Sequence, residues 1–184
     1  IRHRGPDDEG YLLANTSEES ILNCHAEDSI NECKSQLPHV LNDFNANLGM
    51  GFRRLSIIDL SAAGHQPMTD VNQKCWIVFN GEIYNYLEVK EELKTKGYSF
   101  TTKSDTETIL AAYAEWGESI QDRFAGMWSM VIFDRLKGEL FLSRDRYGIK
   151  PLYYYFSPSG DFCFSSEIKQ FTVVPGWKAS ANKA

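Results

Sequence analysis

The pattern of hydrophobic and polar positions predicts strands toward both ends of the chain and helices between them. Strand-like stretches cover residues 11–15, 21–25 and 48–58, and a short apolar run follows at residues 76–80. Residues 26–47, in contrast, are polar, acidic and aperiodic, which is typical of a surface insertion. The first half of the chain is therefore expected to consist of strands interrupted by one polar segment.

Two helices are predicted in the middle of the chain. The first covers residues 86–96, with a capping box of Asn85 and Glu88 at its start and Gly97 at its end. The second covers residues 104–116 and also begins with a capping box. Its apolar stripe consists of Ile109, Leu110, Ala112 and Tyr113.

From residue 127 onward the hydrophobic period changes to two, which predicts hairpins. Residues 127–134 and 139–144 form the first hairpin, and residues 152–156 and 162–165 form the second. A short helical segment, 166–171, follows. Because hairpins link most of the strands, the sequence predicts an α+β fold with antiparallel sheets layered against helices, and not an alternating parallel fold.

Composition narrows the class of protein further. A chain of 184 residues is one domain of ordinary size, and its 42% hydrophobic and 13% aromatic content excludes a disordered protein. No apolar run approaches transmembrane length. The net charge is −6 without a basic cluster, which argues against nucleic acid or an anionic membrane as the main partner.

The four cysteines carry no paired spacing. Cys24, Cys33, Cys75 and Cys163 lack a C-x-x-C motif, so no zinc site or other metal site is expected. Cys24 and Cys33 could form a disulfide, but free thiols in a reducing cytosol are the favoured interpretation, which predicts a cytoplasmic protein. The chain starts at Ile1 and enters a dense motif at once, and we interpret it as a fragment whose true start is missing.

The most informative stretch is WIVFNGEIYN, residues 76–85. Its apolar run ends in Asn80 and Gly81, a pair that normally marks a tight hairpin turn because both residues tolerate positive φ. The alternative is that the Asn80 carboxamide and the Gly81 backbone N–H lie side by side at a strand end. Two such donors could stabilise the oxyanion of an acyl-transfer intermediate, and glycine lets a substrate approach the backbone.

Three charged residues could hold the ends of an amino acid that carries a side-chain amide. Arg54 follows an apolar strand and could grip an α-carboxylate in a bidentate fork, although a surface ion pair is its more ordinary role. Asp105 lies in the first turn of a predicted helix, where a negative charge is favourable in any case. Glu82 follows Gly81 and could share an α-ammonium with Asp105. No cysteine lies in a motif with a nearby base, so the sequence shows no nucleophile.

Seven motifs follow one another in the chain, and together they identify a family. They are RHRGPDDEG (2–10), RRLSIIDL (53–60), GHQPM (64–68), NGEIYNY (80–86), SDTE (104–107), RDRYGIKPLYY (144–154) and SSEIK (165–169). This set resembles the class II glutamine amidotransferase domains. Within that class it is similar to the glutaminase domain of glutamine-hydrolysing asparagine synthetases, because Glu82 directly follows Asn80-Gly81 and because of the block at 144–154.

The resemblance implies an N-terminal-nucleophile hydrolase-like fold, a four-layer αββα sandwich with antiparallel sheets. It covers residues 1–175, apart from a surface insertion at about 16–47 that is expected to lie away from the pocket. Residues 176–184 would begin a linker to an absent synthetase domain. The family's nucleophile is a cysteine exposed as the first residue after removal of Met, and its α-amine is the general base. This chain begins downstream of that point, so the fragment alone is expected to be inactive.

The resemblance also implies a glutamine pocket in which Asn80 and Gly81 form the oxyanion hole. The pocket residues are Arg54, Leu55, Ser56, Ile57, Ile58, Asn80, Gly81, Glu82 and Asp105. Supporting or scaffold roles are assigned to Arg4, Gly5, Arg144, Asp145 and Gly148.

The implied activity is hydrolysis of glutamine to glutamate and ammonia. In the parent, a C-terminal synthetase domain would use ATP and Mg²⁺ to adenylate aspartate, and ammonia would displace AMP. No cofactor is expected in the glutaminase domain, and a homodimer is an open alternative. Two other functions compete: an amidotransferase acting on another carboxylate, in surface-polysaccharide or secondary metabolism, and a non-catalytic glutamine-binding domain.

Overall fold

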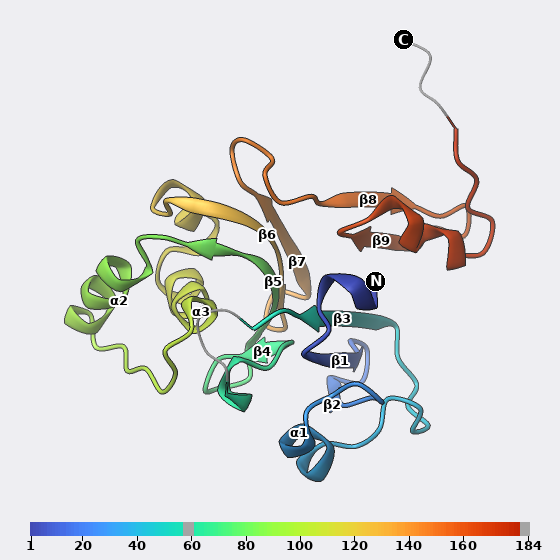
Figure 1. Ribbon diagram of the computed structural model, residues 1–184, viewed down its shortest axis with the longest axis horizontal. Helices are drawn as coiled ribbons and strands as arrows, with labels where there is room; N and C mark the ends of the chain where they lie inside the picture. Colours follow the sequence, from blue (N-terminus) through green and yellow to red (C-terminus); the bar gives the residue numbers. More distant parts are fainter. Residues whose placement is uncertain (57–60, 181–184) are drawn as a thin grey trace.

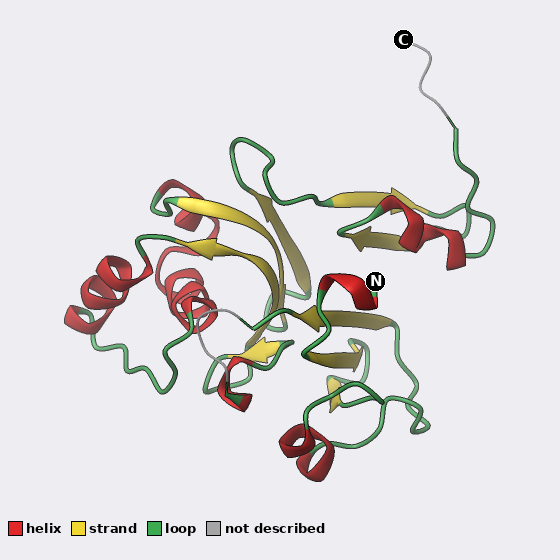
Figure 2. Ribbon diagram, viewed as in Figure 1, coloured by secondary structure: helices red, strands yellow, loops and turns green. Residues whose placement is uncertain are grey.

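The computed structural model describes residues 1–56 and 61–180, and it has the mixed helix and strand content that the sequence predicts (Figures 1 and 2). The strands are β1 (Asp8–Asn15), β2 (Ser20–Cys24), β3 (Leu48–Arg54), β4 (Met68–Thr69), β5 (Cys75–Ile83), β6 (Gly126–Asp134), β7 (Glu139–Arg144), β8 (Tyr153–Phe156) and β9 (Phe162–Ser165). The α-helices are α1 (Asn31–Gln36), α2 (Tyr86–Thr95) and α3 (Asp105–Trp116). Four 3₁₀ segments complete the fold: η1 (Arg2–Arg4), η2 (Ala62–Gly64), η3 (Gly117–Asp122) and η4 (Ile168–Val173).

The strands form antiparallel sheets, as expected for a chain rich in hairpins. One sheet has the order β2-β1-β3, a second has the order β4-β5-β6-β7, and β8 pairs with β9. The two predicted hairpins are confirmed, with register pairs Asp134↔Glu139 in β6–β7 and Phe156↔Phe162 in β8–β9. Helices α2 and α3 lie on one face of the four-stranded sheet, and the three-stranded sheet lies on its other side (Figure 1).

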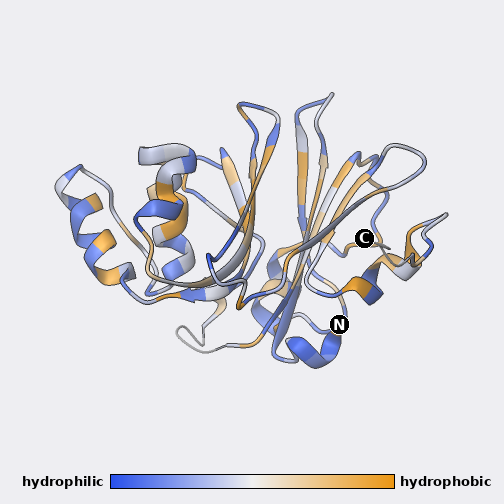
Figure 3. Cartoon of the chain, turned by 90° about the horizontal axis from the view of Figure 1, so that it is seen from above, coloured by the Kyte–Doolittle hydropathy of each residue, from blue (hydrophilic) through white to orange (hydrophobic). Residues whose placement is uncertain are grey.

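One hydrophobic core lies between the four-stranded sheet and the helices α2 and α3, and a second lies between the four-stranded and three-stranded sheets. Strand β5 contributes side chains to both cores. Successive side chains of a strand point to opposite faces, so Ile77 and Phe79 pack toward α2 and α3, whereas Trp76 and Val78 pack toward the other sheet. Hydrophobic positions accordingly gather in the strands and on the helix faces beside them (Figure 3). Both faces of the four-stranded sheet are therefore buried.

Helix starts show where the local prediction was incomplete. Asn85 precedes α2, but its side chain makes no cap bond; it accepts from Ala125 N at 2.8 Å and donates to the Arg123 carbonyl at 2.9 Å instead. The predicted capping box of Asn85 and Glu88 is therefore wrong. The stop is right, because Gly97 follows the helix with a φ of +95° that favours glycine.

The start of α3 is capped as predicted at one of the two positions. Ser104 Oγ accepts from Thr106 N at 3.1 Å, which satisfies one free helix donor. Glu107, the second member of the predicted box, accepts instead from the backbone N–H groups of Thr101 and Thr102, each at 2.8 Å. This carboxylate fixes the loop that leads into α3.

The predicted surface insertion is more ordered than its aperiodic sequence indicates. It contains α1, and Cys33 in that helix is 7% exposed. Ile30 N donates to Asp8 in β1 at 3.0 Å, and Asp28 forms an ion pair with Arg53 in β3 at 2.7 Å. The segment is held by polar contacts rather than by an apolar face, which explains why hydrophobic periodicity missed its helix. Within the described residues, no helix is long and apolar enough to cross a membrane.

Candidate functional site

A cavity of about 300 Å³ opens between the two main sheets and the start of α3. Five of the predicted pocket residues line it: Arg54, Leu55, Asn80, Gly81 and Asp105. Ser56 and Glu82 are not among the described lining residues, and Ile57 and Ile58 lie outside the residues that the structure describes. The predicted surface segment 26–47 contributes no lining residue from the described chain.

Arg54 ends β3 and is 7% exposed at the cavity wall. Its Nη1 donates to the Ser61 carbonyl oxygen at 2.9 Å, which holds one side of the guanidinium. Gly64 makes room for the other side, because a Cβ at that position would lie only 2.0 Å from Arg54 Nη2. The Ser61 carbonyl and the space at Gly64 therefore set the place of the guanidinium beside the cavity.

Asn80 and Gly81 do not form the hairpin turn that their sequence normally marks. They lie within β5 and pair with Ser129 and Trp128 of β6, and the strand continues to Ile83. Gly81 is required by close packing: a Cβ there would lie 2.3 Å from the Met127 carbonyl oxygen. The hairpin interpretation is therefore wrong, and the strand end proposed in the alternative lies beyond this pair.

Asp105 is the first residue of α3 and is 5% exposed. Its Oδ2 accepts from Ile83 N at 3.1 Å. Burial raises the pKa of this carboxyl above its ordinary value, and the nearby charge of Glu82 raises it further, although hydrogen bonds from the backbone of Ile83 and Thr106 oppose the rise. Within the described chain no Lys, Arg or His forms an ion pair with Asp105. The site therefore presents a buried carboxylate that a ligand cation would stabilise.

Gln66 is a lining residue that the sequence did not single out as part of the site. It is 6% exposed, its Oε1 accepts from Phe79 N at 2.7 Å, and its Nε2 donates to the Phe79 carbonyl at 3.3 Å and to Thr106 Oγ1 at 3.4 Å. The side-chain amide thus acts as a short strand partner for β5, one residue before Asn80. Gln66 belongs to the GHQPM motif, but the motif does not reveal that its side chain bonds the backbone of Phe79.

None of the four cysteines is among the described residues that line the cavity. All four are free thiols; Cys24, Cys33 and Cys75 are buried elsewhere, and Cys163 lies in β9. Burial raises the pKa of Cys75 to about 12, with the nearby charges of Asp134 and Asp70 adding to the effect. These thiols are protonated at neutral pH and cannot attack a ligand in the cavity.

The RDRYGIKPLYY block forms a folded turn, which agrees with the scaffold role expected for it. The Asp145 carboxylate accepts from the backbone N–H groups of four residues: Trp128, Tyr147, Ile149 and Lys150. Burial opposes the ionisation of Asp145, but these hydrogen bonds hold its pKa below the ordinary value. Arg144 donates to the carbonyl groups of Gly148 and Lys150 at 2.6 and 2.7 Å.

At the cavity rim, Arg4 is held by an ion pair with Glu167 at 3.2 Å. Gly5 lets the first turn of the chain pack on β3, since a Cβ at Gly5 would lie 2.4 Å from the Arg53 carbonyl carbon. Both contacts are consistent with the supporting role expected for these residues.

Comparison with known proteins adds independent findings. A family model described as a glutamine amidotransferase domain matches residues 27–184. Asparagine synthetase (glutamine-hydrolyzing) 1 of Bacillus subtilis is 39% identical over 95% of this chain, and asparagine synthetase (glutamine-hydrolyzing) 2 of the same organism is 37% identical over 95%. The chain spans 22% and 19% of the length of these relatives.

A solved structure supports the fold separately. Glutamine phosphoribosylpyrophosphate amidotransferase from B. subtilis superposes with a TM-score of 0.73 and 19% identity, over 94% of this chain and 38% of that one. At this identity the likeness concerns the fold, and it confirms the predicted N-terminal-nucleophile hydrolase-like architecture with antiparallel sheets.

Proposed function

The chain belongs to the glutamine amidotransferase domain family, and from that premise we propose that its cavity binds L-glutamine as the glutaminase site of a glutamine-hydrolysing asparagine synthetase. One observation carries the proposal. A single cavity is lined by a buried guanidinium, Arg54, a buried carboxylate, Asp105, and a carboxamide, Asn80. An amino acid with a side-chain amide offers a matching group to each of them.

The two charged residues suit the two ends of a zwitterion. The planar guanidinium of Arg54 can grip an α-carboxylate with two parallel hydrogen bonds. Asp105 is destabilised in its ionised form by burial and by Glu82, so an α-ammonium beside it would return its pKa toward the ordinary range. Glu82 does not line the cavity in the described chain, and its proposed contribution is this added negative potential rather than direct contact.

Asn80 and Gly81 are proposed to stabilise the oxyanion that forms when the side-chain amide is attacked. The rigid pairing of β5 with β6 supports this role, because donors that are already fixed in place need no reorganisation as charge develops. Gln66 holds the strand from the cavity side through Phe79, immediately before Asn80. We therefore infer that Gln66 positions the oxyanion donors without contacting the reacting atoms.

The nucleophile is proposed to be the family's N-terminal cysteine, supplied in the parent protein. None of the four cysteines of this chain lines the described cavity. The 184-residue chain alone is thus expected to bind glutamine without hydrolysing it, which is also the behaviour of the second candidate, a non-catalytic glutamine-binding domain. A glutamate-release assay of the parent protein separates the two candidates, because the glutaminase predicts turnover above a protein-free control and the binding domain predicts none. Turnover by this chain alone would show that another group attacks.

In the parent, we propose that ammonia from this site passes to a C-terminal synthetase domain of the same chain. The chain spans about a fifth of the length of the B. subtilis asparagine synthetases it matches, which leaves room for such a domain. There, ATP and Mg²⁺ would activate the carboxylate of aspartate as an adenylate, and ammonia would displace AMP. No group of the present domain is assigned to ATP or Mg²⁺.

The test compares two nitrogen sources in the parent enzyme. Arg54→Lys should raise the KM for glutamine at least tenfold, while synthesis from ammonium chloride stays nearly unchanged, because a Lys ammonium cannot reproduce the bidentate fork. Arg135→Lys is the matched control, since Arg135 lies in the β6–β7 turn and bonds backbone carbonyls of Gln73 and Glu19. Equal loss of both activities in Arg54→Lys would make Arg54 a structural residue and overturn the assignment.

A further inference from the structure

Three aromatic side chains form an exposed cluster on the β8–β9 hairpin. Tyr154 is 68% exposed, Phe156 is 64% exposed and Phe162 is 36% exposed. The ring centroids lie 5.1 Å apart for Phe156 and Phe162, 6.2 Å for Tyr154 and Phe156, and 6.3 Å for Tyr154 and Phe162. Rings at such distances stabilise one another, yet together they leave a continuous apolar surface open to solvent. A contiguous apolar patch of this kind marks a place where another surface binds.

The aromatic cluster occupies one face of the hairpin, and the other face is already covered. Phe156 pairs directly with Phe162, and Tyr154 lies two residues before Phe156, so the three side chains project to the same side. On the opposite side, the Tyr155 ring lies 5.8 Å from the ring of Phe171 in η4, and Phe171 is 5% exposed. Segment η4 therefore packs on the face that lacks the aromatic cluster.

The face that carries the cluster is buried at its inner end. Phe164 pairs with Tyr154 and therefore belongs to this face. It packs against the core between the two main sheets and lines the cavity, and Leu152, two residues before Tyr154, does the same. The face thus runs from the cavity wall to the surface. A partner that covers its exposed part would lie at the edge of the cavity.

The chemistry of the hairpin favours a protein surface over nucleic acid. Residues 153–165 contain one charged side chain, Asp161, and it is negative. Aromatic platforms that stack nucleic-acid bases lie in positively charged grooves that follow the phosphates, and this hairpin has no such charge. Aromatic residues with few charges around them are typical of the buried centre of a protein–protein interface.

We propose that the aromatic cluster is the surface on which the synthetase domain of the parent protein docks, an inference that rests on the function proposed above. The B. subtilis relatives are several times longer than this chain, so most of their length lies outside it. The last described residues also run beside the hairpin (Figure 1): a Cβ at Gly176 would lie 3.6 Å from Cγ of Pro158 in the β8–β9 turn. A domain joined through these residues would be tethered beside the cluster at an effective concentration of roughly millimolar.

Docking at this face would protect the ammonia that the glutaminase site releases. In neutral water ammonia takes up a proton and loses the lone pair with which it attacks a carboxyl derivative. Because Leu152 and Phe164 connect the cavity to the cluster, a domain seated on the cluster would receive ammonia at the edge of the cavity rather than from solvent. Loss of docking should therefore uncouple glutamine hydrolysis from amide transfer and leave the glutamine pocket intact.

A photoreactive residue in the parent protein tests the contact directly. Phe156→p-benzoylphenylalanine places a benzophenone in the cluster, and peptide mass spectrometry after irradiation identifies what it touches. The cross-link should join position 156 to the synthetase domain of the same polypeptide, in a product with the mass of one chain. Val71, which is 83% exposed between β4 and β5, is the matched position, and the same replacement there should give no such cross-link. Cross-links from position 156 to a second copy alone, or none to the synthetase domain, would overturn the proposal.

Initial rates of the parent enzyme test the consequence. The double variant Tyr154→Ser, Phe156→Ser loses two aromatic anchors, so the glutamate released per asparagine formed should rise by about twofold or more, with the KM for glutamine unchanged. Val71→Ser should change neither quantity. An unchanged ratio in a folded double variant would also refute the docking surface. The cross-link requires neither turnover nor the double variant, so it is decisive even if that variant does not fold or the cavity does not bind glutamine.

Discussion

Replacing Gly64 with alanine tests the carboxylate clamp without changing any charge. A Cβ at Gly64 would lie 2.0 Å from Arg54 Nη2 and 2.7 Å from Cζ, whereas ordinary contact begins at 3.4 Å. The guanidinium must therefore move by about 1.4 Å, the difference between 3.4 and 2.0 Å. The clashing atoms are at the far end of a flexible side chain, so the backbone can stay in place and the fold should survive.

The expected effect follows from the fork geometry. A displacement of this size breaks at least one of the two charge-assisted hydrogen bonds to the α-carboxylate of glutamine. Such a bond is worth about 1.5–3 kcal/mol, which corresponds to roughly a 10- to 150-fold rise in the KM for glutamine. Misplacement of a bound substrate by about 1 Å can also lower kcat, so kcat/KM should fall by at least the same factor.

The assay uses initial rates of the parent enzyme with glutamine and with ammonium chloride, together with the Tm of each variant. Gly49→Ala is the matched control, because it lies on the same strand as Arg54 and its Cβ would meet only Leu13 Cδ2 at 3.8 Å. Gly64→Ala should impair only the glutamine-dependent rate, and Gly49→Ala neither rate. A folded Gly64→Ala enzyme with an unchanged KM for glutamine would show that the observed place of Arg54 is not the clamp.

Three further substitutions have expected outcomes. Asn80→Ala in the parent should lower kcat by about 10²–10³ with little change in KM, and a change in KM alone would make Asn80 a binding group only. Asp105→Asn should abolish glutamine binding, yet it should raise the Tm of the ligand-free chain at pH 7. Because the folded pKa of Asp105 is raised, this gain in Tm should fade as the pH falls through the raised pKa toward 3.8. A lower Tm of the variant at pH 7 would contradict the prediction. Glu167→Gln should speed hydrogen exchange in the first residues of the chain. Lys169, His3 and Arg4 hold the pKa of Glu167 at about 2, so the stabilisation by the ionised carboxylate is full above pH 4.5 and is lost as the pH falls toward 2. Near pH 2 the exchange rates of variant and parent should therefore become equal.

Local signals were sufficient for much of the fold. The β6–β7 hairpin depends on period-two alternation and a short turn, both of which lie within about twenty consecutive residues. Helix α3 was equally readable, because its apolar stripe faces a single neighbouring sheet. These elements need no knowledge of distant partners, and the structure has them within one or two residues of their predicted bounds.

The failures occur where a side chain chooses among distant partners. The Asn85 side chain could cap α2, but it forms hydrogen bonds with the backbone of Arg123 and Ala125 instead. Asn80-Gly81 carries a turn signal, yet nine register pairs between β5 and β6 keep it extended. The turn propensity of a few residues stabilises a turn less than a continuous ladder of hydrogen bonds and cross-strand contacts stabilises the strand.

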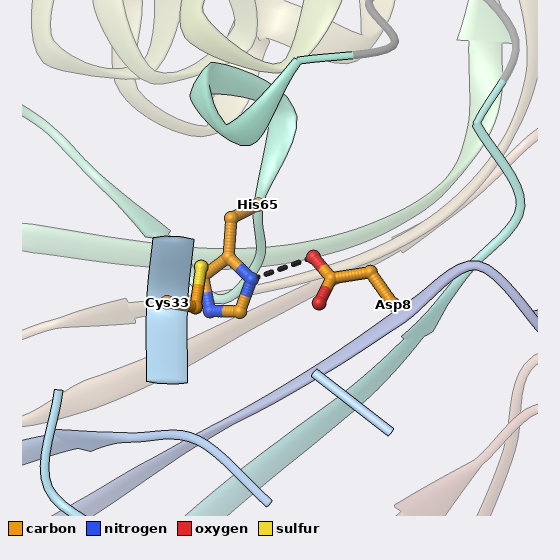
Figure 4. Close-up of side chains that lie close together, drawn as sticks. All are labelled: Asp8, Cys33 and His65. Atoms are coloured by element: carbon orange, nitrogen blue, oxygen red, sulfur yellow. Dashed lines mark hydrogen bonds and ion pairs between the residues drawn. The ribbon is translucent and has the colours of Figure 1, made fainter. Parts of the chain in front are cut away.

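The pocket shows the same division. Motif resemblance located Arg54 and Asp105, and both line the cavity. It did not show that Gln66 would complete the β5 strand, or that Cys33 would lie beside Asp8 and His65 (Figure 4), because each contact joins segments with no shared periodicity.

The loop before β4 gives these separate parts a common support. Ser61 holds the Arg54 guanidinium, Gly64 leaves space for it, and His65 binds Asp8 on β1. Gln66 then joins the same loop to β5 and to the start of α3. Arg54 at the end of β3 and Asp105 at the start of α3 are the two charged residues of the proposed glutamine site. Because this loop contacts both elements, it sets the distance between these two residues.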